Sequence, residues 1–258
     1  MLVRIGIDKM LLDASQGKLA LGVLVAKVKV GIKHDALWQS LQEMGETQLK
    51  QYGTTPIQSI PGIQALNQTY KSLGLKAENK GSNEALLNRV LSGKGLYQIN
   101  TVVDANNFVS IASLRSVGSY DLSKVGQDII FRPGLAEETY PATTQRPLKL
   151  HQLPVLCDNA GPFGSPTSDS KRALITEETV DLMTVIFSFD GLDGLELQLQ
   201  QMAGLLTEFS CATNIQCKVV QQTNVVSFEV SPSEFSFFAP QPAAVAPSVV
   251  VADTVKPL

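Results

Sequence analysis

Apolar residues in the first part of the chain change from a strand-like to a helix-like spacing. The stretch 18–30, KLALGVLVAKVKV, is rich in branched residues and ends in alternating valine and lysine, which predicts a long strand. Residues 2–7 are expected to form its hairpin partner. In 35–52, apolar side chains recur every three or four positions, which predicts an amphipathic helix with Trp38 as a core anchor.

The rest of the chain continues to mix helices and strands. A helix is predicted over 63–73, ending at Gly74, and Ser82 is expected to cap a helix over 84–91. Residues 195–209 have helical periodicity. Strand patterns recur at 128–132, 153–157, 180–189 and 224–230. Because no regular strand-helix-strand alternation is present, we predict an α+β fold with a mixed or sandwiched β core.

Length and composition indicate one globular domain with a tail. The 258 residues are 44% hydrophobic and 17% charged, and a domain typically occupies about 100–150 residues or more. We predict one domain over 1–238 and a flexible tail over 239–258, where proline, alanine and valine dominate. No apolar run reaches the roughly 18–20 residues that span a bilayer. Charges near the N-terminus interrupt any secretory signal, so no membrane partner and a cytoplasmic location are expected.

Several kinds of chemistry are disfavoured by the residues present. The two histidines, His34 and His151, are isolated, and the three cysteines lack CxxC spacing. Neither GxGxxG nor GxxxxGK[ST] occurs, so a nucleotide cofactor is not indicated. The net charge of −3 has the wrong sign for a protein that neutralises many DNA phosphates. We therefore expect no metal, no cofactor and no DNA partner.

One central segment, 99–111, has more short polar side chains than an ordinary core element. They are Asn100, Asp104, Asn106, Asn107 and Ser110. Buried polar side chains need partners, so two interpretations stay open. Either Asn100 caps a turn and Asp104 caps the following helix, or this segment lines a pocket. In the second case Asn107 presents its amide to a ligand, although Asn106 could equally be the exposed neighbour.

Five short segments occur in one order along the chain. They are SNEALLNRVL (82–91), INTVVD (99–104), NFVS (107–110), GSYDLSK (118–124) and IIFR (129–132). In this order they resemble the B3/B4 domain of the phenylalanyl-tRNA synthetase β subunit. A late Asp-Ser-x-Arg element at 169–172, before ITEET at 175–179, is similar to the free-standing B3/4 proteins. The resemblance covers roughly 5–230.

This resemblance implies both a fold and an activity. It implies a β-sandwich-like core of unusual topology flanked by helices. It also implies an editing hydrolase, acting in trans on the acceptor end of a mischarged tRNA through a positioned water, with no metal and no covalent intermediate. The ATP-binding synthetase core belongs to other domains. Gly118 stands where the synthetase family has a histidine, so the side-chain donor of that histidine is missing here. Lys171 falls near the position of the family's pocket glutamate.

The resemblance and the residue types together select candidate site residues. The expected catalytic residues are Asn107, Ser170 and Arg172, and the expected substrate-binding residues are Asn100, Asp104, Ser110, Gly118, Tyr120, Asp121 and Asp169. These segments are expected to converge on one pocket. The alternatives are a core aromatic at Tyr120, a helix cap at Asp121, and a structural salt bridge in place of an anion-binding fork at Arg172.

A locally basic region precedes the INTVVD segment. Its members are Lys71, Lys76, Lys80, Arg89 and Lys94. They form either a solvated face or a surface that guides the acceptor end of tRNA.

Three function classes are consistent with the sequence as a whole: an aminoacyl-tRNA deacylase, a non-catalytic module that binds RNA or a small metabolite such as a free amino acid, and an interaction domain with a vestigial pocket.

Overall fold

The computed structural model of the protein describes residues 1–76, 78–143 and 147–231. The helices are α1 (Lys9–Ala14), α2 (Asp35–Tyr52), α3 (Pro61–Ser72), α4 (Ser82–Leu91), α5 (Thr101–Ser113) and α6 (Leu195–Ser210). The strands are β1 (Leu2–Ile7), β2 (Ala20–Lys27), β3 (Ser116–Asp121), β4 (Asp128–Pro133), β5 (Thr139–Pro141), β6 (Pro147–Lys149), β7 (Pro154–Asp158), β8 (Gly161–Gly164), β9 (Asp181–Ser188), β10 (Thr213–Gln221) and β11 (Val226–Glu229). The predicted boundary at residue 238 and the tail 239–258 lie outside the described residues.

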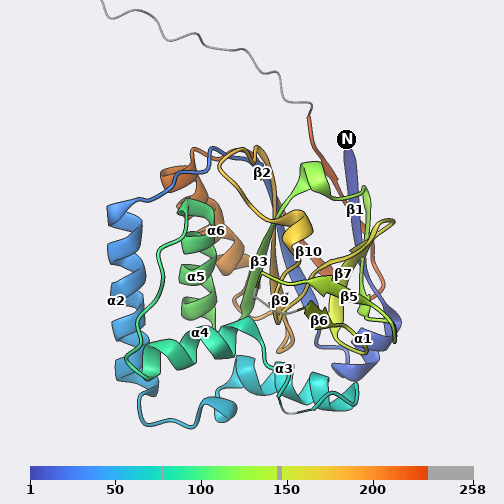
Figure 1. The fold of residues 1–258 in the computed structure, drawn as a ribbon, viewed down its shortest axis with the longest axis horizontal. Coiled ribbons are helices and arrows are strands. Elements are labelled where there is room, and N and C mark those ends of the chain that lie inside the picture. The colour runs from blue at the N-terminus through green and yellow to red at the C-terminus, as the bar shows by residue number, and fades with distance from the viewer. Residues whose placement is uncertain (77, 144–146, 232–258) are drawn as a thin grey trace, which may run out of the picture.

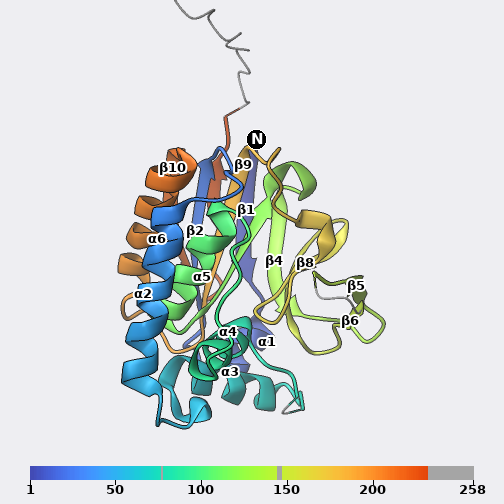
Figure 2. The ribbon, with the colours of Figure 1, turned by 60° about the vertical axis from the view of Figure 1, so that its left-hand side comes forward.

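Two large sheets and a layer of helices make up most of the fold, and β5 and β6 form a separate two-stranded sheet. A four-stranded antiparallel sheet has the order β10-β2-β9-β3, and a five-stranded mixed sheet has the order β11-β1-β4-β7-β8 with β1 and β4 parallel. Helices α2, α5 and α6 lie on one side of the four-stranded sheet, and the five-stranded sheet lies on its other side (Figure 2). Helices α3 and α4 lie across one end (Figure 1). The predicted α+β class with a flanked two-sheet core is confirmed.

Strand β2 is buried on both faces, which explains its continuous apolar sequence. Leu21 and Val23 point into the core between the sheets, whereas Leu24 packs with the helices. On the helix side, a Cβ at Gly22 would lie 2.8 Å from the Leu195 Cδ1 atom. Glycine at this position therefore lets α6 approach the sheet closely.

The predicted hairpin between 2–7 and 18–30 is wrong. Strand β1 pairs with β4 and β11, and β2 pairs with β9 and β10 in the other sheet. Helix α1 intervenes, and Asp8 caps it by accepting a 2.7 Å hydrogen bond from the Met10 amide. The pattern of apolar residues correctly indicated two strands, but it carries no information about which sheet each strand joins.

Two local predictions about helices also need correction. Helix α4 begins at Ser82 itself, with Gly81 at the N-cap, because the Gly81 carbonyl already accepts from the Ala85 amide. The Ser82 amide instead donates to the carbonyl of Pro166. Trp38 is half-buried and packs on a satellite cluster around Leu41, outside the core between the sheets.

Arg115 joins β3 to the connection between β9 and α6. Its side chain is 4% exposed, and Nε lies 2.8 Å from the Asp190 carboxylate. The guanidinium also donates to Gln198 Oε1 at 2.8 Å and to the Asp193 carbonyl at 3.0 Å. A buried arginine whose donors are used in this way holds several segments in one geometry.

We expect Arg115→Ala to lower the free energy of unfolding by about 3 kcal/mol, because removing one partner leaves the others buried and unpaired. The matched control is Arg4→Ala. Arg4 pairs with Asp128, but the two side chains are 51% and 68% exposed, so its loss should cost under about 1 kcal/mol. Chemical denaturation measures both values. Equal losses would show that Arg115 has no special structural role.

Candidate functional site

Three buried tyrosines hold the loop formed by residues 164–170, between β8 and the short helix η3 (Lys171–Ala173). The hydroxyl of Tyr70 on α3 lies 2.8 Å from Thr167 Oγ1. Tyr140 on β5 donates to the Ser168 carbonyl at 2.5 Å. Tyr120 on β3 donates to Asp169 Oδ1 at 2.8 Å. The 164–170 loop is thus attached to three separate parts of the fold.

Asp169 is the single carboxylate of this loop, and its pKa is raised. Burial raises its pKa from 3.8 to about 6, although hydrogen bonds from the Ser165 amide (3.1 Å) and the Tyr120 hydroxyl lower it. Both bonds end on Oδ1. The side chain is only partly buried, so Oδ2 is the oxygen left for a water molecule or substrate. A pKa near the working pH suits a general base.

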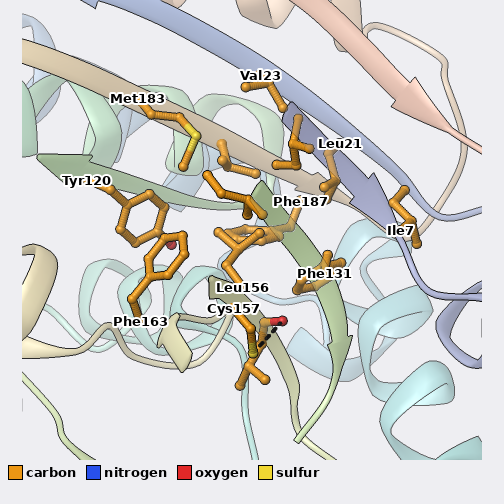
Figure 3. Close-up of a cluster of buried hydrophobic side chains, with 14 of the residues drawn as sticks. Ile7, Leu21, Val23, Tyr120, Phe131, Leu156, Cys157, Phe163, Met183 and Phe187 are labelled. Carbon is orange, nitrogen blue, oxygen red and sulfur yellow. Dashed lines mark hydrogen bonds between the residues drawn. The ribbon is translucent and has the colours of Figure 1, made fainter. Parts of the chain in front are cut away.

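Two glycines make the room that Tyr120 occupies. A Cβ at Gly118 would lie 2.3 Å from the Tyr120 hydroxyl and 3.3 Å from Asp169 Oδ2, and one at Gly164 would lie 2.4 Å from the Tyr120 ring. The ring of Tyr120 stands edge-to-face with Phe163, 5.1 Å between centroids (Figure 3). The tyrosine hydroxyl therefore fills the space in which a side chain at position 118 would begin.

Three polar residues of α5 and its N-cap make most of their contacts with nearby backbone groups. Asn100 caps α5 by accepting from the Val103 amide at 2.9 Å. Asp104 Oδ1 accepts from the Ile99 amide at 2.9 Å, while Oδ2 is buried with no hydrogen-bond partner among the described residues. Burial raises the pKa of Asp104. Ser110 donates to the Arg115 carbonyl at 2.8 Å. Asn100 and Asp104 therefore both accept from backbone amides, but Asn100, rather than Asp104, caps the helix. Asn100 also lines a cavity of about 650 Å³.

Asn106 and Asn107 lie on the far side of β3 from Asp169. Asn106 is buried and accepts from Ser119 at 2.9 Å, so it is not the exposed neighbour. Ser119 points to the helix side of the sheet, whereas Tyr120 points into the core between the sheets. Helix α5 therefore covers one face of the sheet and Asp169 lies beyond the other. The predicted convergence joins Gly118, Tyr120 and Asp169 but does not include α5.

Arg172 and Ser170 have structural partners. Arg172 binds Asp158 through two 2.9 Å hydrogen bonds and donates to the Gly161 carbonyl at 2.9 Å. The salt-bridge alternative therefore describes Arg172 in this structure. Ser170 Oγ accepts from the Arg172 amide at 3.1 Å and caps η3.

Asp121 also follows the capping alternative. It accepts from the Ser123 amide at 3.0 Å and from Thr179 Oγ1 at 2.9 Å. The first contact caps the short helix η2 (Leu122–Lys124), and the second ties the ITEET segment to β3. The catalytic roles of Asn107, Ser170 and Arg172 stay predictions.

Sequence reasoning missed the residues that surround Asp169. They are Tyr70, Tyr140, Ser165, Thr167 and Ser168. A usable signal was present, because GSPTSDS at 164–170 is a run of short polar residues like the one that drew attention to 99–111.

Within 1–76, 78–143 and 147–231, no group of three or more histidine, cysteine, aspartate or glutamate side chains could hold a metal ion. Over the same residues, no helix has the length and apolarity to cross a membrane.

A comparison with protein-family models agrees with the resemblance. The family model described as the B3/4 domain matches residues 65–202, more than half of the chain. A search of curated proteins finds no match. Among solved structures, the chain is similar to an N-terminal fragment of the phenylalanyl-tRNA synthetase β subunit from Pyrococcus horikoshii, with 12% identity and a TM-score of 0.46. The match covers 88% of this chain and 55% of that one, so the chain spans about half the length of that fragment.

The raised pKa of Asp169 predicts a pH dependence of stability. Folded Asp169 holds its proton up to about pH 6, whereas the unfolded chain releases it near 3.8. The contribution of Asp169 to the free energy of unfolding is therefore greatest below about pH 4. It falls, by up to about 3 kcal/mol, as the pH rises through 6. Asp169→Asn lacks this titration. We expect the free energy of unfolding of wild type, relative to that of the variant, to fall as the pH rises from 4 to 7. A constant difference would contradict the raised pKa.

Proposed function

The chain belongs to the B3/4 domain family, and from this premise we propose that it hydrolyses the ester bond of an aminoacyl-tRNA, with Asp169 as the group that activates water. The observation that carries the proposal is the partly buried Asp169 carboxylate, whose Oδ1 is fixed by Tyr120 and Ser165. Its pKa of about 6 leaves it mainly ionised at pH 7. It can therefore accept a proton from water held at Oδ2.

The reaction proceeds without a covalent enzyme intermediate. Asp169 takes a proton from water as the water oxygen bonds to the ester carbonyl carbon. The bond from that carbon to the ribose oxygen then breaks, and the proton passes to the ribose oxygen. The products are a free amino acid and tRNA with its terminal hydroxyl restored. Because the ester is activated, positioning a water molecule is most of what the catalyst must do.

The developing negative charge on the carbonyl oxygen needs a donor. We place this role with the hydroxyls of Thr143 and Ser168, which lie 3.3 Å apart, because Ser168 directly precedes Asp169 in the chain. The Thr143 amide donates to the Asp169 carbonyl, so the strand end and the loop are held together. One such donor is worth on the order of 3 kcal/mol. The Arg172 guanidinium is less suited because Asp158 and backbone carbonyls already engage it.

A binding module is the second candidate function, and the same carboxylate favours it. Ionised Asp169 would attract the α-ammonium group of a free amino acid through a charge-assisted hydrogen bond. In that case the protein would bind an amino acid or uncharged tRNA and leave the ester intact.

We expect Asp169→Asn to lower deacylation by about a hundredfold or more at pH 7, the usual contribution of a general base. The rate is measured with a panel of labelled aminoacyl-tRNAs after subtraction of spontaneous hydrolysis. Wild type should become faster as the pH rises through about 6, and the variant should not. The matched control is Asp35→Asn, an exposed carboxylate on α2.

Two further results distinguish the competing assignments. Loss of activity in Asn107→Ala with full activity in Asp169→Asn would move the site to α5 and reject the role of Asp169. If wild type leaves the whole panel intact but binds a free amino acid, the binding module replaces the enzyme.

A further inference from the structure

A groove of about 590 Å³ lies along α3 and the segment that leads to α4. Amide side chains and lysines line much of it, and all but the half-buried Asn79 of those named next are exposed. They include Gln64, Gln68 and Lys71 from α3, and Lys76, Asn79 and Lys80 from the following segment. We call this surface the α3 groove.

The α3 groove has a net positive charge, although the chain as a whole has a net charge of −3. Its single lining acid, Glu84, is buried and pairs with Lys80 at 2.7 Å, and it also accepts from Asn67 at 3.0 Å. Lys71 and Lys76 are exposed and have no carboxylate partner among the described residues. Two cations therefore remain available to an anionic ligand.

The other lining groups suit a nucleic acid better than an isolated anion. Gln64, Gln68 and Asn79 each offer both an amide donor and a carbonyl acceptor. Such groups bind ribose hydroxyls and base edges, while lysines bind the phosphates between them. A groove of this size accommodates a short single strand rather than one small ion.

The α3 groove is connected to the proposed active site. Tyr70 lines the groove, and its hydroxyl contacts Thr167 in the 164–170 loop that carries Asp169. The α3 groove and the 164–170 loop therefore adjoin at Tyr70. Of the basic residues noted in the sequence, Arg89 lies over the Tyr97 ring and donates to Gly95, so it belongs to a different surface.

We propose that the α3 groove binds the single-stranded 3′ end of tRNA, with Lys71 and Lys76 on its phosphates. The proposal rests on the proposed function for the identity of the RNA, but binding needs no ester chemistry. Each lysine that contacts a phosphate of a single strand contributes about −0.7 to the slope of log affinity against log salt. Removing two such lysines should reduce that slope by about 1.4.

The test uses the full chain and fluorescence anisotropy with uncharged tRNA and with a labelled single-stranded RNA ending in CCA. We expect Lys71→Ala/Lys76→Ala to weaken binding of both probes about tenfold at low salt and to reduce the salt slope as stated. The matched control is Lys94→Ala, an exposed lysine close in sequence but outside the groove. Asp35→Asn, at an exposed position on α2 outside the groove, should bind the RNA as wild type does. Circular dichroism confirms that each variant is folded.

Three results would overturn the proposal. They are the absence of RNA binding by wild type, equal binding by wild type and the double variant, and equal losses in the double variant and Lys94→Ala. An acidic peptide that binds the groove while RNA does not would assign the surface to a protein partner instead. Loss of deacylation in Asp169→Asn together with weakened RNA binding in the double lysine variant supports both proposals. RNA binding with no deacylation by wild type supports the groove and rejects the enzyme.

Discussion

The four-stranded sheet is covered on both faces, and most of the structure depends on this constraint. Strands β2 and β9 contribute side chains alternately to the helix layer and to the core between the two sheets. Such burial supplies the main free energy of folding, since each fully buried aliphatic side chain contributes about 1.5–3 kcal/mol. It also separates the molecule into two sides. Polar groups on α5 cannot reach Asp169, because the sheet lies between them.

Close packing at the edge of this sheet determines the chemistry of the candidate site. Gly118 and Gly164 leave space for the Tyr120 ring, and the ring brings its hydroxyl to Asp169. The same packing excludes water from part of the carboxylate and raises its pKa. Desolvation and hydrogen bonding act in opposite directions here, and desolvation is the larger. The result is a carboxylate that is held in place by neutral donors.

The α3 groove and the 164–170 loop form a physically continuous region through the contact between Tyr70 and Thr167. Lys80 and Glu84 neutralise each other, so the positive charge of the groove resides on Lys71 and Lys76. A long-range field from the whole protein would repel RNA weakly, because the net charge is negative. Local lysines and amides are thus required for any RNA contact, and the groove is a place where they gather.

The sequence by itself determined where most helices and strands lie and that the fold is α+β. It did so because burial imposes a period on apolar residues, as in 35–52 and 195–209. Capping also follows from local chemistry, and the alternatives stated for Asn100 and Asp121 describe their contacts. Only the tertiary structure decided that β1 and β2 join different sheets, because strand pairing is set by long-range packing. It also decided that Tyr70, Tyr120 and Tyr140 meet at one loop, since no local pattern encodes which distant side chains a buried hydroxyl reaches.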